Sequence, residues 1–136
     1  MIAFNSALAG TMDAKSLEIK YGKKVESGFV FDSAILEAKT KDFLVALKKV
    51  FGESFEKVLK KKSIRAGIGK MRGRKYKSNA GLLFVVASDE KMKRKGIEVV
   101  NVKDLEVKDL APNGEPGRIT CYSEKAISEL GGNKNE

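Results

Sequence analysis

The spacing of apolar residues along the first part of the chain predicts helix, loop and strand in turn. Apolar residues at helical spacing over residues 2–10 predict an opening helix that ends near Gly10. Scattered charges and glycines over residues 17–28 predict strand and loop. The apolar run over residues 28–32 then predicts a short strand.

Two helical pieces are expected next. Thr40 is a residue type that favours the N-cap, and Asp42 follows it in the first turn, where a carboxylate is favourable. Gly52 is expected to end or kink this helix. A second helical piece is expected to start near Phe55 and to run into the lysines at residues 60–62.

The second half of the chain predicts a buried sheet. Residues 82–87 (LLFVVA) form a continuous apolar run, which is typical of a strand buried on both faces of a parallel sheet. Further strands are expected over residues 97–102 and 118–122. Short helices are expected over 90–95 after Asp89, over 107–110 before a turn at 111–114, and over 124–130 after Ser123, with Ala126, Ile127 and Leu130 facing inward. This alternation indicates a single α/β domain with an open, largely parallel, Rossmann-like sheet and helices on both faces, in three layers.

The positive charge is concentrated in one window. The formal net charge is +9, yet residues 57–88 hold ten basic residues and no acidic one, so that the remainder of the chain balances to −1. The basic residues of this window are Lys57, Lys60, Lys61, Lys62, Arg65, Lys70, Arg72, Arg74, Lys75 and Lys77. Such a run is typical of a surface that binds a polyanion, and residues 60–81 are expected to form an extended basic arm. A solvated flexible loop is the alternative, although such a loop normally mixes both signs of charge.

The composition argues against catalysis and metal binding. The chain has no histidine and one cysteine, which disfavours a zinc site and leaves Cys121 without a histidine to activate it. Cys121 lies in an apolar stretch and is expected to be a small core residue. The carboxylates Asp104, Glu106 and Asp109 have no neighbours that would give them separate acid and base roles. We therefore expect no enzyme activity, no cofactor and no metal.

The chain shows no sign of a membrane or secreted protein. No apolar run approaches the roughly 20 residues of a membrane helix, and residues 1–11 do not resemble a signal peptide. A lone cysteine gives no indication of an oxidising compartment. A cytoplasmic protein is expected.

Glycines recur along the basic arm, but they do not form a nucleotide-binding motif. Gly67, Gly69 and Gly73 give G-x-G-x-x-x-G, which is one residue longer than the dinucleotide fingerprint and follows a predicted helix rather than a strand. Gly69 and Lys70 resemble half of a P-loop, but position 64 is isoleucine and position 71 is methionine, so the first glycine and the Ser/Thr are missing. The glycines instead allow sharp turns that bring backbone N–H groups close to phosphates.

The residue types of the arm favour folded RNA as the polyanion. Arginine can grip a phosphate bidentately, and Tyr76 can stack on an unpaired base. One aromatic residue is too little for a single-strand stacking platform, which favours an RNA met through its shape and backbone. Because like charges repel, we expect the isolated chain to have a disordered arm over about residues 63–81.

Residues 65–77 (RAGIGKMRGRKYK) resemble the signature of a known family. This is the archaeal and eukaryotic form of large-subunit ribosomal protein L-four, which helps to wall the peptide exit tunnel. Other segments agree in order along almost the whole chain: residues 6–9 (SALA) with Thr11, 40–41 (TK), 99–102 (VVNV), 109–112 (DLAP), 116–118 (PGR) and 123–127 (SEKAI).

The resemblance implies a structural protein of the large ribosomal subunit that binds ribosomal RNA early in assembly. Its implied fold is an open, largely parallel α/β sheet. The implied contacts with ribosomal RNA are Arg65, Lys70, Arg72, Arg74, Lys75, Tyr76 and Lys77, with Gly67, Gly69 and Gly73 shaping the backbone, and the charge pattern adds Lys60, Lys61 and Lys62 as candidates. The implied partners are large-subunit ribosomal RNA, neighbouring large-subunit proteins and a separate N-terminal portion of the same family, in the cytoplasmic ribosome.

Two departures limit what the resemblance implies. The chain begins at the predicted helix over residues 2–10, after the first strand and long tunnel loop of the family, so tunnel lining is not expected of these residues. Ile68 stands where family members often have a basic residue, which removes one phosphate contact. A long C-terminal extension of the eukaryotic kind is not seen, which favours the archaeal type.

Two other interpretations stay open from the residues alone. A small-molecule-binding α/β domain or enzyme would need a pocket with convergent polar groups at the ends of the strands. A protein-interaction or regulatory RNA-binding module outside the ribosome would use the arm against an acidic protein surface or a messenger RNA.

Overall fold

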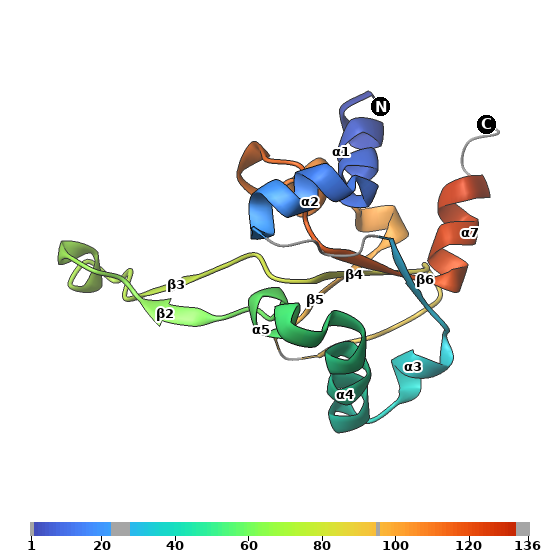
Figure 1. Cartoon of the computed structure of the whole chain (residues 1–136), viewed down its shortest axis with the longest axis horizontal. Coiled ribbons are helices and arrows are strands. Elements are labelled where there is room, and N and C mark those ends of the chain that lie inside the picture. Colours follow the sequence, from blue (N-terminus) through green and yellow to red (C-terminus); the bar gives the residue numbers. More distant parts are fainter. Residues whose placement is uncertain (1, 23–27, 95, 133–136) are drawn as a thin grey trace.

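A four-stranded sheet in which all neighbouring strands run parallel lies at the centre of the molecule (Figure 1). The computed structural model describes residues 2–22, 28–94 and 96–132. The strand order is β1-β6-β4-β5. These strands are β1 (Phe29–Phe31), β4 (Leu83–Val86), β5 (Glu98–Asn101) and β6 (Thr120–Ser123). The predicted α/β class with a largely parallel sheet is therefore confirmed.

Helices pack around this sheet, and a separate hairpin extends away from it. The helices are α1 (Ile2–Met12), α2 (Ala14–Tyr21), α3 (Ala34–Glu37), α4 (Thr40–Phe51), α5 (Phe55–Val58), α6 (Val107–Leu110) and α7 (Glu124–Gly132). Short 3-10 turns are η1 (Gly52–Ser54), η2 (Ile68–Lys70), η3 (Val102–Asp104) and η4 (Pro112–Gly114). The hairpin consists of β2 (Lys62–Ile64) and β3 (Tyr76–Ser78), which pair with each other alone.

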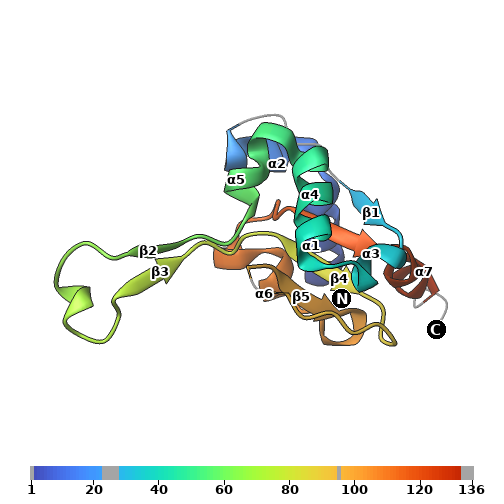
Figure 2. The same cartoon turned by 90° about the horizontal axis from the view of Figure 1, so that it is seen from below.

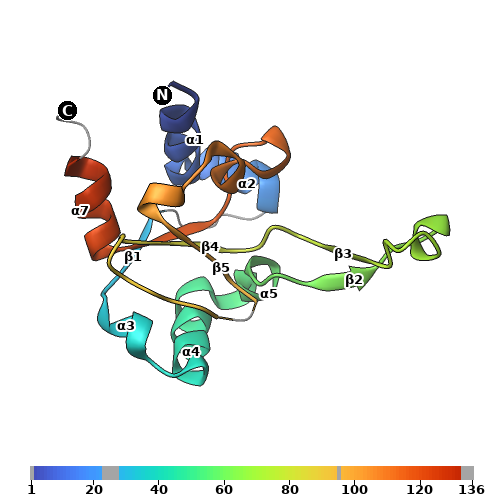
Figure 3. The same ribbon diagram turned by 180° about the vertical axis from the view of Figure 1, so that it is seen from behind.

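Strand β4 organises the core because all four of its residues are buried. Successive side chains of a strand point to opposite faces, so β4 contributes to two apolar clusters. Phe84 and Val86 pack with the apolar face of α4 and with Val58 of α5. Leu83 and Val85 pack with apolar residues of α1, α6 and α7. Helices thus cover both faces of the sheet, as the pattern predicted (Figure 3).

Several predicted elements are confirmed close to their expected bounds. These are α1, β1, β5, α6, β6 and the buried strand β4. Helix α4 ends at Phe51, and Gly52, whose φ is 50°, is its C-cap, as expected. Ser123 caps α7, because its Oγ accepts a hydrogen bond from the backbone N–H of Ala126 at 3.2 Å. Cys121 is fully buried in the core, as expected.

The prediction of strand and loop over residues 17–28 was wrong for residues 17–21, which belong to helix α2. Asp13 is the N-cap of this helix, and its carboxylate accepts hydrogen bonds from the backbone N–H groups of Lys15 and Ser16 at 3.3 and 3.1 Å. Gly22 ends the helix in the left-handed conformation with φ of 67°. The Asp13 cap and the Gly22 stop are both visible in the sequence, but the scattered charges obscured the helical spacing of the apolar residues. The part of the prediction over residues 23–27 lies outside the described residues.

The predicted helix over residues 90–95 was also wrong where the structure describes it. Residues 90–94 follow an irregular path, and Lys95 lies outside the described residues. Arg94 turns toward α3 and α4, where its guanidinium donates hydrogen bonds to the carbonyl groups of Leu36, at 2.9 Å, and Ala38. It also lies 4.8 Å from the ring centroid of Phe43. These tertiary contacts hold the segment away from helical geometry.

Three smaller expectations need correction. The N-cap of α4 is Lys39 rather than Thr40, whose hydroxyl instead accepts a hydrogen bond from Arg94 at 3.2 Å. The helix from Phe55 ends at Val58, so the lysines at 60–62 do not extend it, and Lys62 already begins β2. Ile127 was expected to face the core, but 38% of it is exposed to solvent.

Candidate nucleic-acid interface

The basic arm is an antiparallel hairpin that projects from the body of the molecule (Figures 1 and 2). Its register pairs Lys62 with Ser78, Ser63 with Lys77, and Ile64 with Tyr76. All six of these residues are exposed. The sequence predicted an arm but not its paired strands, because residues that face solvent on both sides carry no apolar alternation.

Glycines shape the tip of the arm. Gly67 and Gly73 have φ of 82° and 73°, a region that side chains with a Cβ rarely adopt. Between them, the carbonyl of Gly69 accepts backbone hydrogen bonds from Arg72 and Arg74 at 3.3 and 3.1 Å. The tip is therefore a compact turn that holds its basic side chains outward.

The root of the arm is fastened by the side chain of Asn79 and by the close approach of two backbone segments. The side chain of Asn79 accepts a hydrogen bond from the N–H of Lys61 at 2.6 Å and donates one to the carbonyl of Leu59 at 3.2 Å. Gly81 has φ of 67°, and a Cβ at this position would lie 3.0 Å from the backbone nitrogen of Lys60. The two chain segments can approach this closely because residue 81 is glycine.

Arg118 ties the same root to the sheet, although it is only 2% exposed. Its guanidinium donates to the carbonyl groups of Gly81 and Ala80, both at 2.9 Å, and to that of Asp109 at 2.6 Å. It also forms an ion pair with Glu98 of β5 at 2.7 Å. The hydrogen bond from Arg118 holds the pKa of the Glu98 carboxyl below its ordinary value, although burial opposes this shift. This role of Arg118 could not be predicted, because the pattern over residues 118–122 indicated only a strand.

Most of the candidate residues remain available to a ligand. All thirteen of them are exposed except Gly69, which is half-buried. Lys61 forms an ion pair with Glu56 at 3.2 Å, and both side chains are largely exposed. Within residues 2–22, 28–94 and 96–132, the other candidate lysines and arginines have no carboxylate within ion-pair distance. Lys57 was counted in the basic window but donates to the carbonyl of Tyr21 at 2.9 Å, so it faces the body.

Tyr76 is the aromatic residue of the arm, and its ring is half-exposed. The Nζ atom of Lys62 lies 4.2 Å from the ring centroid, and that of Lys75 lies 5.7 Å from it. Ile64 pairs with Tyr76 across the two strands. The arm thus brings an aromatic ring and two ammonium groups together.

The other candidate chemistry of the sequence has structural explanations. The carboxylate of Asp109 accepts a hydrogen bond from the N–H of Glu106 at 3.0 Å, and Glu106 forms an ion pair with Lys108 at 2.7 Å, so this acidic cluster stabilises the start of α6. Burial raises the pKa of the Cys121 thiol, which makes it unreactive. Among the described residues, no group of three acidic or cysteine side chains is placed to hold a metal ion.

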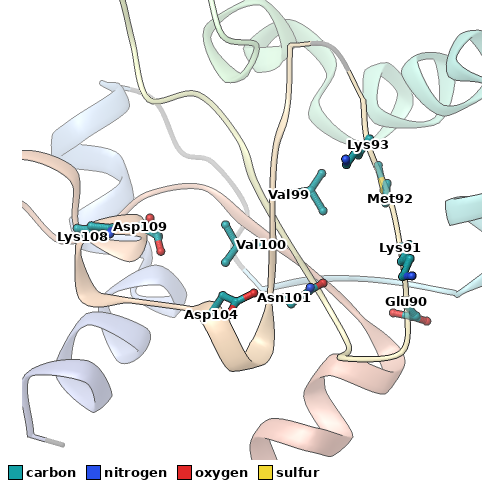
Figure 4. Close-up of a pocket in the computed structure, with 10 residues that line it drawn as sticks. All are labelled: Glu90, Lys91, Met92, Lys93, Val99, Val100, Asn101, Asp104, Lys108 and Asp109. Atoms are coloured by element: carbon teal, nitrogen blue, oxygen red, sulfur yellow. The ribbon is translucent and has the colours of Figure 1, made fainter.

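A hollow of about 720 Å³ runs beside β5 (Figure 4). Val99 and Val100 point to opposite sides of the strand, and Asp104, Lys91 and Lys93 lie around them. The charged groups are spread along an open edge rather than converging on one point. This hollow therefore does not support the alternative of a small-molecule site.

Glu90 is a buried carboxylate that the sequence did not single out. It accepts hydrogen bonds from the hydroxyl groups of Ser123 and Ser33 at 2.6 and 2.9 Å, and from the N–H of Ala87 at 3.1 Å. These residues stand at or just after the carboxyl ends of β6, β1 and β4. Burial favours the neutral acid, but the hydrogen bonds outweigh it and hold the pKa of Glu90 below its ordinary value, with help from Lys125.

None of the helices in the described ranges combines the length and the apolar character that a membrane crossing requires.

Comparison with known proteins gives a consistent result. No protein-family model matches the chain. Large ribosomal subunit protein uL4 of Haloquadratum walsbyi is 36% identical over 138 positions, which cover 95% of this chain and 55% of that protein. The uL4 protein of Saccharolobus solfataricus is 36% identical over 95% of this chain and 52% of its own length, and that of Sulfurisphaera tokodaii is 39% identical over 74% and 41%. The chain belongs to the uL4 family.

The uL4 relatives confirm the resemblance found in the sequence. They match almost the whole chain, whereas the chain spans about half the length of the curated relatives. These relatives come from archaea, in agreement with the expected type. They are named as proteins of the large ribosomal subunit, which favours neither an enzyme nor a module outside the ribosome.

Proposed function

We propose that this chain is the RNA-binding α/β part of a large-subunit ribosomal protein and that its basic arm holds ribosomal RNA. The observation that carries the proposal is the arm itself. It projects beyond the sheet and helices (Figure 2). Residues 60–77 hold nine basic residues and no acidic one, and almost all of these charges are without carboxylate partners in the described parts of the chain. The uL4 relatives support ribosomal RNA as the polyanion, because they are named as large-subunit ribosomal proteins.

The proposed contacts are those expected from the sequence. They comprise Lys60, Lys61, Lys62, Arg65, Gly67, Gly69, Lys70, Arg72, Gly73, Arg74, Lys75, Tyr76 and Lys77. Lysine and arginine neutralise phosphates and release condensed counterions, so that affinity falls as salt rises. With roughly five phosphate contacts, the slope of log affinity against log salt is near −4 to −5.

The proposed surroundings follow from the same assignment. The partners are large-subunit ribosomal RNA, neighbouring large-subunit proteins and a separate N-terminal portion of the family, in the cytoplasmic ribosome. The finer fold assignment, a Rossmann-like sheet in three layers, belongs to this proposal and is supported by apolar clusters on both faces of the sheet.

The test removes two charges from the tip of the arm. The double variant Arg72→Ala, Arg74→Ala should bind purified archaeal large-subunit ribosomal RNA roughly 25- to 60-fold more weakly at about 0.1 M salt, with the salt slope reduced by roughly 1.4 to 1.8. The matched control is Lys48→Ala, Lys49→Ala, which removes two exposed charges from α4 and should change affinity much less. Filter binding across a salt series measures both quantities. Equal effects of the two double variants would show that general charge, and not the arm, drives binding.

A further inference from the structure

The two faces of the arm hairpin differ in chemistry. Residues paired directly across an antiparallel ladder lie on the same face, and neighbours along a strand lie on opposite faces. One face therefore carries Ser63 and Lys77, and the register continues to Arg65 and Lys75, which are joined by a backbone hydrogen bond of 2.9 Å. The opposite face carries Lys62, Ile64, Tyr76 and Ser78. The first face is basic, whereas the second combines an apolar pair with a lysine and a hydroxyl.

A hollow of about 370 Å³ lies at the root of the arm, beside Tyr76. Its lining consists of Lys60, Lys62, Tyr76, Lys77, Ser78 and Gly96. Three of these residues are lysines, and none of the described residues that line the hollow is a carboxylate. The nearby carboxylate of Glu98 is held by Arg118 at 2.7 Å. Glu98 offsets part of the charge of Lys60, and the hollow still combines an aromatic wall with an excess of positive charge.

We propose that this hollow takes one unpaired nucleotide of the bound RNA, with its base on the Tyr76 ring and its phosphate among Lys60, Lys62 and Lys77. This inference rests on the proposed function and adds to it the orientation of the arm. Arg65 and Lys75 on the basic face follow the phosphate backbone beyond this nucleotide, while the Ile64 and Tyr76 face meets the base.

Three observations support this occupant. The volume is within the range of pockets that hold small organic ligands, so it has room for one nucleotide but not for a duplex. Tyr76 is 49% exposed and Ile64 is 57% exposed, so an apolar surface on the arm stays uncovered until something packs on it. The Nζ atom of Lys62 lies over the ring, which shows that the ring face accepts a cationic neighbour and is not packed against the body. Base stacking on an aromatic ring needs no particular base, so we expect tolerance of base identity.

The test separates the ring from the charge. Tyr76→Ala should weaken binding to purified archaeal large-subunit ribosomal RNA by about 5- to 150-fold, with an unchanged salt slope because no charge is lost. Tyr76→Phe keeps the ring and should stay within about 2-fold of the wild type. Tyr76→Leu keeps apolar bulk without a π face and should behave like Tyr76→Ala. The matched control is Met71→Ala, which removes another apolar side chain of the arm, 90% exposed and outside the hollow, and should change affinity less than about 2-fold.

The outcomes distinguish this inference from the proposed function. If wild-type protein binds the RNA with a steep salt slope and both Tyr76→Ala and Tyr76→Leu keep full affinity, the nucleotide site is wrong and the arm still binds RNA. If the wild type binds with no steep slope, the proposed function itself fails.

Irradiation of the wild-type complex at a wavelength that crosslinks protein to RNA gives an independent measurement. A Tyr76 adduct on a nucleotide that chemical probing finds unpaired supports the site, and an adduct confined to paired nucleotides overturns it.

Discussion

Single buried polar residues decide how the secondary-structure elements meet. Glu90 joins three neighbouring strands at their carboxyl ends, and Arg118 joins the arm root to β5 and α6. Neither role could be read from the sequence, because an isolated Glu or Arg in a polar stretch is usually a solvated residue. Cys121 was predictable, since it lies within an apolar strand pattern. The local sequence pattern thus shows which apolar residues are buried. Whether a polar residue is buried depends on hydrogen-bond partners that are distant in the chain.

Glu90 should make the stability of the protein depend on pH. Its folded-state pKa is lowered, so its carboxylate stabilises the fold above the ordinary pKa of glutamate, and this contribution is lost as the pH falls through the lowered value. Glu90→Gln should therefore lower the free energy of unfolding by about 1–3 kcal/mol near neutral pH. The difference from the wild type should shrink steadily between about pH 5 and pH 3.

Urea denaturation at several pH values measures this difference. Glu37→Gln, at an exposed glutamate on α3, is the control and should change stability by less than about 0.5 kcal/mol. If the difference in free energy of unfolding between Glu90→Gln and the wild type stays constant down to about pH 3, the negative charge of Glu90 does not contribute to stability.

Among the helices and strands, prediction and structure agree best where burial on one or both faces sets a regular spacing of apolar residues. Strand β4 and helix α4 were predicted because their apolar residues face a core. Helix α2 was missed because Leu17 is the one buried residue in it, so little apolar period is present. The β2–β3 pairing was missed for the same reason, since no residue of either strand is buried. What was predictable in the arm was its charge, which does not depend on its backbone conformation.

The hairpin of the arm should open readily when no RNA is bound. Two short strands without a buried face are marginal in water, and Arg65 and Lys75 place like charges opposite each other just beyond the paired strands. Backbone amides of β2 and β3 should therefore exchange with solvent at least about 100-fold faster than those of β4, which is fully buried. Addition of large-subunit ribosomal RNA should slow the arm amides and leave β4 unchanged. Hydrogen exchange read by mass spectrometry gives both values, and strong protection of the arm in free protein would contradict the expectation of disorder.

The whole molecule divides into a charged arm and a nearly neutral body. None of residues 63–77 is buried, and these residues hold six basic groups and no acidic one. The fastening at Asn79, Gly81 and Arg118 lies outside this segment. Folding and binding should therefore be separable in one variant.

Replacing residues 63–77 by Asn-Gly tests this separation. Lys62 and Ser78 face each other across the ladder, and a two-residue turn of this type is the commonest connection between two antiparallel strands. The net charge falls from +9 to +3, because six basic residues are removed. The free energy of unfolding should change by less than about 1 kcal/mol, since no buried side chain is lost. The salt slope for binding to large-subunit ribosomal RNA should fall by roughly 4 to 5 if all six groups meet phosphates. A variant that unfolds would show that the arm is part of the fold, and one that keeps the full slope would place RNA binding on the body.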